Sequence, residues 1–363
     1  MADPDNYEDG YVLWVTSQDV KSNYLDRTTT QITEKGAKEL TLYPAGSLVM
    51  VTRSGILRHT LPVAELRKPS TVNQDIRVIL PQGECCGEWL LQFFISHNKE
   101  LLLEFGKTGT TVESVDFGKI KDMLLYMPST VEQQQIGDFF AKLDSLITLH
   151  QRKYDKLVIF KKSMLEKMFP KDGESVPEIR FAGFTDPWEQ RKFSNLTDRV
   201  SMQSSDPDLP QVEYEDIVSG EGTLNKDLRD KEGGKTGIKF YAGDVLYGKL
   251  RPYLMNWLYP QFNGVAVGDF WVLRATECDS SFLYRLVQTD SFQRLANVSS
   301  GSKMPRADWN LISQSFFAVP ADYAEQRVIA KSLAELDDLI TLHQRKLELL
   351  QNIKKSLLDK MFV

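Results

Sequence analysis

The sequence predicts an α+β protein in which two mixed α/β modules are separated by two long antiparallel coiled-coil helices. Three observations predict this fold. A segment of 38 residues occurs twice, both copies have heptad periodicity, and each copy follows a module rich in short β-branched stretches. The repeat carries the most weight, because a missed repeat misassigns a whole fold. The chain has 363 residues, enough for two to three domains, and its 42% hydrophobic content is that of a globular protein.

The repeat is centred on residues 146–153, which recur unchanged at 339–346, an offset of 193. Without gaps, residues 132–169 share 22 identities with the second copy in 38 positions, which excludes chance. Weaker matches upstream, at offsets of 197 and 192, indicate that the preceding modules are diverged copies of each other. We therefore predict a first module at 1–127, a helical spacer at 128–170, a linker at 171–187, a second module at 188–319 and a second spacer at 320–363.

Each repeated segment is predicted to form one amphipathic helix with a heptad seam of apolar residues. At a rise of 1.5 Å per residue such a helix is about 57 Å long. That is about three times the average for a globular protein, so we expect the two helices to pair with each other. The residues assigned to the seam are Ile136, Leu143, Ile147, His150 and Leu157 in the first copy, and Ile329, Leu336, Ile340, His343 and Leu350 in the second.

Two kinds of polar residue interrupt the seam at matched positions. His150 and His343 share one position, and Lys161 and Lys354 share another. The histidines either fix the register of the helices or lie at the edge of the seam, and both interpretations stay open. For the lysines we favour stems that cover the seam and ammonium groups that reach solvent. No carboxylate or thiol repeats beside the histidines, which argues against a catalytic or metal role.

The modules themselves are predicted as mixed α/β domains. Stretches at 47–52, 76–80, 245–247 and 270–273 are rich in β-branched and aromatic residues and bounded by Gly and Pro, which is typical of strands. Residues 89–105 and 281–296 have helical periodicity. Pro, Gly and charged residues between the first spacer and the second module indicate a linker.

We assign no catalytic residue and no metal site. Two Gly-Lys-Thr triplets, at 106–108 and 234–236, lack the glycine that a phosphate-binding loop carries five residues before the Gly-Lys pair. The Asn/Asp-Pro-Pro-Tyr/Phe signature of adenine methyltransferases is absent, and the four histidines and three cysteines have no zinc spacing. The few cysteines, the polar N-terminus and the lack of a long apolar run lead us to expect a cytoplasmic protein.

Binding is the function that remains, and matched basic loops suggest DNA. A net charge of −6 argues against a general nucleic-acid coat but leaves room for local basic patches. Arg and Lys beside Ser and Thr fit contacts to phosphates and base edges, although ordinary solvated surface is an equal alternative for any single residue. The candidate DNA-binding residues are Arg53, Arg58, Lys107, Thr108 and Thr110 in the first module, and Lys249, Arg251, Ser302, Lys303 and Arg306 in the second.

The chain resembles the specificity (S) subunit of type I restriction–modification enzymes, the HsdS family. The resemblance rests on Pro-Ser-Thr-Val-Glu-Gln at 128–133, on Pro320 followed by Glu325-Gln326, and on the Lys-Lys-Ser-x-Leu-x-Lys-Met-Phe that ends both helical copies. Residues 181–192 (FAGFTDPWEQRK) are similar to the opening of a family recognition domain. The resemblance covers essentially the whole chain and is specific in the helical regions.

The resemblance implies two target recognition domains, each binding one half of an interrupted site in double-stranded DNA. It implies a non-catalytic chain that binds no cofactor itself and recruits two methyltransferase subunits, with restriction subunits as further partners. S-adenosylmethionine, ATP and Mg would belong to those partners. No counterpart of residues 179–198 precedes the first module, so we expect an incomplete first domain. The alternative is a truncated or silent-cassette relative that binds DNA or partners without supporting modification.

Overall fold

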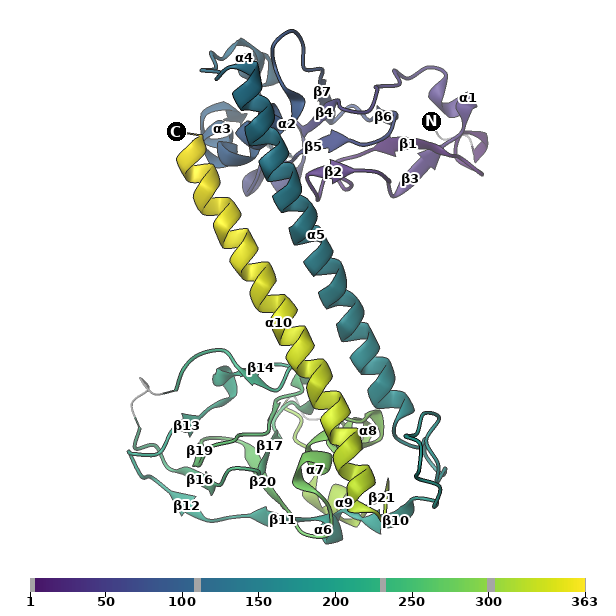
Figure 1. The fold of residues 1–363 in the computed structure, drawn as a ribbon, viewed down its shortest axis with the longest axis vertical. Helices are drawn as coiled ribbons and strands as arrows, with labels where there is room; N and C mark the ends of the chain where they lie inside the picture. Colours follow the sequence, from purple (N-terminus) through teal and green to yellow (C-terminus); the bar gives the residue numbers. More distant parts are fainter. Residues whose placement is uncertain (1–3, 108–111, 229–232, 299–303, 363) are drawn as a thin grey trace. The chain divides into compact units, whose positions relative to one another are not determined.

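The computed structural model of the protein describes residues 4–107, 112–228, 233–298 and 304–362 (Figure 1). These residues form two units, Met1–Arg152 with His343–Val363 (unit 1) and Lys153–Leu342 (unit 2). Each unit contains one mixed α/β head and one part of each of the two long helices, α5 (Thr130–Lys167) and α10 (Tyr323–Met361). The predicted α+β fold with two long helices is confirmed.

The head of unit 1 contains two small sheets. In one, β2 (Tyr24–Leu25) runs parallel to β5 (Val63–Leu66), and β4 (Leu48–Val51) lies antiparallel between β5 and β7 (Ile76–Ile79). The other has the order β3-β1-β6, with bounds Thr30–Ile32, Val12–Val15 and Ser70–Val72. The remaining elements are η1 (Pro4–Asn6), α1 (Glu34–Ala37), η2 (Gly55–Arg58), α2 (Gly87–Ser96), α3 (Asn98–Phe105), β8 (Gly106–Lys107), β9 (Ser114–Val115) and α4 (Phe117–Asp122).

Strand β4 lies at the centre of this head because both of its faces are buried. Successive strand side chains point to opposite faces. Leu48 and Met50 accordingly join the cluster that contains Trp89 of α2, whereas Val49 and Val51 join a second cluster. A strand buried on both sides needs an unbroken apolar run, and the Leu-Val-Met-Val of β4 supplies it.

The head of unit 2 is built in the same way with more strands. Its sheets have the orders β11-β20-β17-β18 and β12-β16-β19-β13, and two-stranded pairs join β10 to β21 and β14 to β15. The strand bounds are β10 Glu189–Lys192, β11 Thr197–Val200, β12 Gln203–Ser204, β13 Gln211–Val212, β14 Ile217–Val218, β15 Thr223–Leu224, β16 Gly237–Phe240, β17 Val245–Gly248, β18 Trp257–Leu258, β19 Gly264–Ala266, β20 Phe270–Ala275 and β21 Phe316–Val319. The helices are α6 (Phe193–Leu196), η3 (Tyr214–Asp216), η4 (Pro252–Leu254), α7 (Ser280–Leu286), α8 (Asp290–Ala296) and α9 (Trp309–Gln314).

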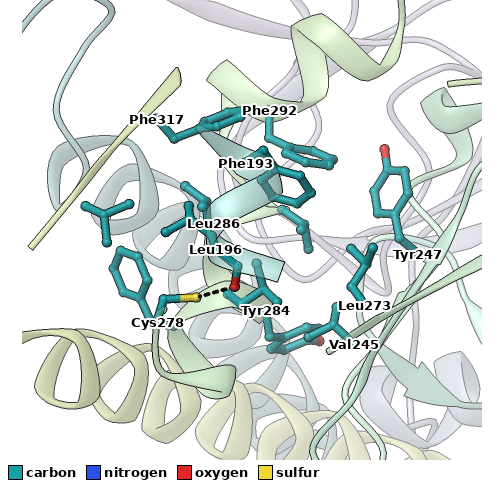
Figure 2. Packing of buried hydrophobic residues seen from close by; sticks show 14 of the residues in the cluster. Phe193, Leu196, Val245, Tyr247, Leu273, Cys278, Tyr284, Leu286, Phe292 and Phe317 are labelled. Carbon is teal, nitrogen blue, oxygen red and sulfur yellow. Dashed lines mark hydrogen bonds between the residues drawn. The ribbon is translucent and has the colours of Figure 1, made fainter. Parts of the chain in front are cut away.

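The main core of unit 2 is aromatic. Figure 2 shows Val245 and Tyr247 of β17 in the same cluster as Phe193, Phe292 and Phe317. The Phe193 ring lies 5.3 Å from that of Phe292 and 5.5 Å from that of Phe317, centroid to centroid. These are the separations at which tilted aromatic pairs attract. Because β17 corresponds to β4, both heads place one central strand against a helical layer.

The predicted strands at 47–52, 76–80, 245–247 and 270–273 are formed as β4, β7, β17 and β20. The two helices predicted in the modules are each broken in two, which corrects the sequence analysis. Residues 89–105 break at His97, next to Asn98, whose side chain accepts a hydrogen bond from the Leu61 amide at 2.9 Å. Residues 281–296 break before Thr289, whose hydroxyl caps α8. A side chain that binds backbone competes with helix continuation.

Within the part of the chain that the structure describes, every helix is too short or too polar to serve as a membrane span.

Candidate nucleic-acid interface and helix pairing

The predicted cations of the first head gather around one short antiparallel ladder. Arg53 follows β4 and forms a bridge with Ser114 of β9, and β9 pairs with β8, which carries Lys107. Arg58 ends η2 and binds the Glu113 carboxylate at 2.5 Å. Arg53, Arg58 and Lys107 are all exposed. The structure therefore brings together the three predicted cations of this head that it describes.

Two carboxylates hold two of these cations in place. The Arg58 guanidinium hydrogen-bonds Glu113 and keeps the pKa of that carboxyl below its usual range. Lys107 Nζ lies 2.7 Å from Asp116 Oδ2, and this hydrogen bond lowers the pKa of Asp116. Asp116 also caps α4 by accepting from the Lys119 amide. Arg53 has no ion-pair partner among the described residues, so its guanidinium is available to a ligand.

The second head gathers its cations around Asp269. Lys249 Nζ lies 3.5 Å from Asp269 Oδ1, and an Arg306 amino group lies 3.1 Å from Asp269 Oδ2. The Tyr214 hydroxyl donates to the Asp269 carbonyl at 2.6 Å and accepts from the Leu250 amide at 2.9 Å, which anchors the loop after β17. Burial raises the pKa of Tyr214, so this hydroxyl stays protonated.

Arg251 is an exposed cation of the second head that has no ion-pair partner among the described residues. Its φ of 48° lies in the left-handed region, which is uncommon for a residue with a side chain. Its amide donates to the Pro305 carbonyl at 2.8 Å, and this bond helps to hold the conformation. Tyr253, two residues later, is 53% exposed. An unpaired arginine beside an exposed aromatic ring suits a nucleic acid, which offers phosphates and flat bases.

The two basic loops have the same backbone hydrogen bonds. In each head, the carbonyl of the first residue after the central strand, β4 or β17, accepts a hydrogen bond from an amide of a later segment of the chain. The amide of the residue two positions further on donates a hydrogen bond to a carbonyl of that same later segment. The four bonds are Val115 N to Thr52 O at 2.9 Å and Ser54 N to Glu113 O at 3.1 Å, and Ala307 N to Lys249 O at 2.8 Å and Arg251 N to Pro305 O at 2.8 Å. The correspondence predicted from offsets of 197 and 192 is therefore present in three dimensions.

Four of the candidate residues lie outside the described residues: Thr108, Thr110, Ser302 and Lys303. Their role stays a prediction, as does DNA contact by the other six. The sequence analysis did not single out the carboxylates of Glu113, Asp116 and Asp269. Glu113 lies 55 residues from Arg58 and Asp269 lies 20 residues from Lys249, so proximity in the sequence gives no signal for these pairings. No cluster of His, Cys, Asp or Glu suited to a metal ion occurs among the described residues.

In unit 1 the seam residues of α5 pack inward with the end of α10. Ile136 and Leu143 are buried, and Ile147 and Leu350 pack against the same cluster. His150 Nδ1 and His343 Nδ1 lie 2.9 Å apart, so one imidazole donates to the other. The histidines therefore face each other within the helix pair, and they lie 193 residues apart at equivalent positions of the repeat. Since Lys354 of α10 contacts Asp144 of α5 in the same unit, residue numbers rise along one helix as they fall along the other, and the helices run antiparallel.

In unit 2 the same seam continues with the roles of the helices exchanged. Ile329 is buried in the main core and Leu336 packs against it, and Leu157 and Ile340 are half-buried. The adjacent Leu339 and Leu342 are 43% and 46% exposed, which marks the outer face of α10. The predicted seam thus faces inward in both units.

The seam lysines bind carboxylates, so the interpretation of solvent-reaching ammonium groups was wrong. In unit 1, Lys354 Nζ lies 2.6 Å from Asp144 Oδ1, and both side chains are buried. In unit 2, Lys161 Nζ lies 2.5 Å from Asp337 Oδ1. Lys161 and Lys354 are equivalent in the repeat, and so are the two aspartates. Burial leaves an ammonium group no water to bind, so an acidic partner replaces it.

Each aspartate also binds the head of its own unit. Gln92 of α2 donates to Asp144 at 3.3 Å, and Arg285 of α7 donates to Asp337 at 2.6 Å. Gln92 and Arg285 are again 193 residues apart. Each head is therefore attached through one equivalent position to a carboxylate that both long helices share.

A glutamine at the start of each long helix makes a second attachment. Gln133 accepts from the Cys86 amide at 2.9 Å and donates to the Pro128 carbonyl at 2.9 Å. Gln326 accepts from the Asp279 amide at 2.7 Å and donates to the Pro320 carbonyl at 2.8 Å. Both glutamines are buried with these hydrogen bonds formed, which explains why both copies carry glutamine at this position.

Comparison with known proteins shows what this chain is similar to. Residues 2–158 match the family model described as type I restriction modification DNA specificity domain. A Methanocaldococcus jannaschii protein, the type I restriction enzyme MjaIX specificity subunit, is 24% identical over 98% of this chain and 87% of its own length. The chain is therefore similar to specificity subunits of the HsdS type. The Escherichia coli EcoDI specificity subunit is 25% identical over 76% of this chain and 68% of its own length.

Other relatives agree over shorter stretches or by fold. The Escherichia coli EcoR124I/EcoR124II specificity subunit is 29% identical over 41% of the chain, and the match spans only 40% of that subunit. A crystal structure of the type I restriction–modification S subunit from M. genitalium aligns over 97% of the chain and 92% of its own, with a TM-score of 0.56 at 13% identity. This chain thus shares the fold of a solved S subunit.

Proposed function

We propose that this chain is the DNA-specificity subunit of a type I restriction–modification enzyme and that each head binds one half of an interrupted target. The observation that carries the proposal is the pair of matched basic loops, each with one exposed and unpaired arginine among the described residues, Arg53 and Arg251. Loops of identical backbone bonding with different side chains suit two readers of different sequence. Local positive charge at these loops reconciles DNA binding with a net charge of −6.

We further propose that the chain is not itself an enzyme and that it recruits two methyltransferase subunits, with restriction subunits as additional partners. The relatives are named as specificity subunits, which supports a role in target choice. The exposed leucines of the outer helix faces, such as Leu149 and Leu339, offer apolar surface for partner subunits. S-adenosylmethionine, ATP and Mg are then bound by the partners.

The test is co-expression of the full chain with its methyltransferase subunit, followed by genome-wide mapping of methylated adenines. We expect one interrupted motif with two specific halves. Arg53→Ala with Arg58→Ala, and separately Lys249→Ala with Arg251→Ala, should each reduce methylation at least tenfold. Lys331→Ala, an exposed helix cation, is the matched control and should leave methylation unchanged.

If the complex with the methyltransferase subunit still forms but the DNA is not methylated, the second candidate is favoured. That candidate is a relative that binds partners or DNA without supporting modification. The observation that favours this candidate is the exposed apolar segment at 124–127 of the first head. A contiguous motif, or a motif unaffected by both pairs of substitutions, would contradict the proposed two-part reading.

A further inference from the structure

The second head is closed by a strand that the first head does not match. Strand β10 pairs antiparallel with β21 over four residues, from Glu189 opposite Val319 to Lys192 opposite Phe316. Strand β21 leads into α10, and its Phe317 and Val319 are buried. The pairing therefore covers the edge and the inner face of the segment that enters the long helix.

The segment before β10 docks through two side chains onto one glutamate. Arg180 binds Glu325 with two hydrogen bonds of 2.7 and 2.8 Å, and Trp188 Nε1 donates to the same carboxylate at 3.1 Å. The Trp188 ring packs against Phe169 and Phe282 at centroid distances of 5.8 and 6.0 Å. As a result Glu325 is only 2% exposed.

The equivalent positions of the first head are exposed and lack these contacts. Residues 124–127 correspond to β21 at an offset of 192, but they pair with no strand among the described residues. Leu124 is 93% exposed and Tyr126 is 99% exposed, and Met127 is 41% exposed where Val319 is fully buried. Glu132, the equivalent of Glu325, is exposed, and no ion pair joins its carboxylate to another described residue.

A pocket lies where Trp188 would be expected. In the second head that indole contacts Phe169, Phe282 and Glu325, whose equivalents at an offset of 193 are Phe362, Trp89 and Glu132. These three residues line one pocket of unit 1 together with Leu124 and Tyr126. The centroids of the Trp89 and Phe362 rings lie 6.0 Å apart, and the rings of Phe282 and Phe169 make the equivalent contact in the second head. The unit thus contains the aromatic walls and the carboxylate of the site without the indole.

We propose that this open edge is a docking site for a β-strand of a separate polypeptide. The occupant carries the pattern of residues 180–192, which is an arginine, a tryptophan eight residues later and then a strand. The arginine binds Glu132, the indole enters the pocket of Trp89 and Phe362, and the strand pairs with 124–127. The second head provides the template for the occupant, because there the same contacts are made within the chain. Backbone pairing supplies affinity and the two side chains supply specificity. The inference is independent of DNA binding.

The probe is a fluorescently labelled peptide with the sequence of residues 179–195, titrated into the full chain. We expect saturable binding that weakens at least tenfold when the peptide carries Trp188→Ala or Arg180→Met. Glu132→Gln in the chain should weaken it comparably, because the charge that pairs with the arginine is lost. Glu335→Gln, another exposed glutamate on a long helix, is the matched control and should leave binding unchanged.

Hydrogen exchange of the full chain locates the site. Without peptide the amides of residues 124–127 should exchange at least tenfold faster than those of 316–319, and peptide should slow the first set alone. Several outcomes would overturn the proposal: no saturable binding at millimolar peptide, equal binding by the Trp188→Ala peptide, or protection elsewhere. Concentration-dependent dimerisation that protects 124–127 without peptide would also overturn it, since a second copy would then be the occupant.

Discussion

At the scale of single residues, the chain is organised by pairs that repeat. Lys354 with Asp144 and Lys161 with Asp337 make the same contact in the two units, at 2.6 and 2.5 Å. The first pair is buried and the second is half-buried, so each charge depends on its partner for compensation. Such pairs contribute little net stability but impose a large penalty when one member is removed. They therefore specify the register of the two helices.

Asp144→Asn should destabilise unit 1 by about 3 kcal/mol, because it leaves the buried Lys354 ammonium group without a counter-charge. Adding Lys354→Met should recover most of this loss by removing the stranded charge. The measurement is the opening free energy of unit 1 from hydrogen exchange of β4 amides. Ser145→Ala, on the exposed side of α5, is the control. A double variant as unstable as the single one would contradict the pairing argument.

Glu65 makes the stability of unit 1 depend on pH. Burial and the nearby charge of Glu88 raise the pKa of Glu65 from 4.5 to about 7, against the opposing effect of Arg67. The unfolded chain loses this proton from about pH 4.5, while the folded chain keeps it until about pH 7. The unfolded state thus binds fewer protons in this window, and stability falls as pH rises through it.

Glu65→Gln should remove that dependence. The opening free energy of the natural chain relative to the variant should fall by up to about 3 kcal/mol between pH 4.5 and pH 8. Exchange of β5 amides at several pH values measures both proteins. Titrating groups that do not interact with Glu65 cancel in the difference, because both proteins carry them. A difference that stays constant across the range would show that Glu65 ionises normally in the folded chain.

The sequence pointed to the lysines and histidines of these pairs more readily than to the carboxylates that bind the lysines. The lysines and histidines were visible as polar interruptions of a heptad seam. Which carboxylate faces each lysine depends on the antiparallel register, and periodicity within one helix does not contain that information. The carboxylates that hold Arg58 and Lys249 were missed for the same reason, since loop contacts are set by tertiary folding.

At the scale of elements, the two long helices are the part of the fold most completely predicted. Their length, their heptad pattern and their near-identity each indicate the same structure, and α5 and α10 follow the predicted bounds within a few residues. The helices inside the heads were predicted less well. Breaks at His97 and before Thr289 depend on side chains that bind nearby backbone, and hydrophobic periodicity continues across both breaks.

The contact between His150 and His343 provides a prediction for the helix pair. His150→Leu and His343→Leu should each destabilise unit 1, and the double variant should be less destabilised than the sum, with a coupling of about 1 kcal/mol. Two leucines at facing seam positions extend the apolar seam. Thermal unfolding of the four proteins completes the cycle, and Thr148→Leu on the exposed face is the control. Additive single effects would show that the imidazoles do not interact.

At the scale of the whole molecule, the chain carries two heads with matched basic loops. Each loop is held by its own hydrogen bonds and its own carboxylates. Substitutions in one head should therefore not alter the other. The sequence predicted this duplication and the basic residues, but not which arginines lack an acidic partner, because that requires the folded loops.

The salt dependence of DNA binding should report the two heads separately. For the assembled complex on DNA containing its methylated motif, Arg53→Ala with Arg58→Ala should reduce the slope of log K against log salt by about 2, at roughly 0.9 per lost phosphate contact. Lys249→Ala with Arg251→Ala should do the same, and all four together should reduce it by about 4. Lys331→Ala is the control. Slopes that do not add would argue against independent heads.

The shared carboxylates of Asp144 and Asp337 have an evolutionary consequence. At the position that both heads share, the junction accepts a neutral amide or a cation as donor, Gln92 in one case and Arg285 in the other. In unit 1 Asn23 adds a second donor to Asp144 at 2.8 Å. Genetic recombination between the near-identical helical stretches would hence graft a foreign head without disturbing the lysine that reaches the carboxylate from the other helix. New specificities become accessible in single exchange events, with little need for compensating mutations.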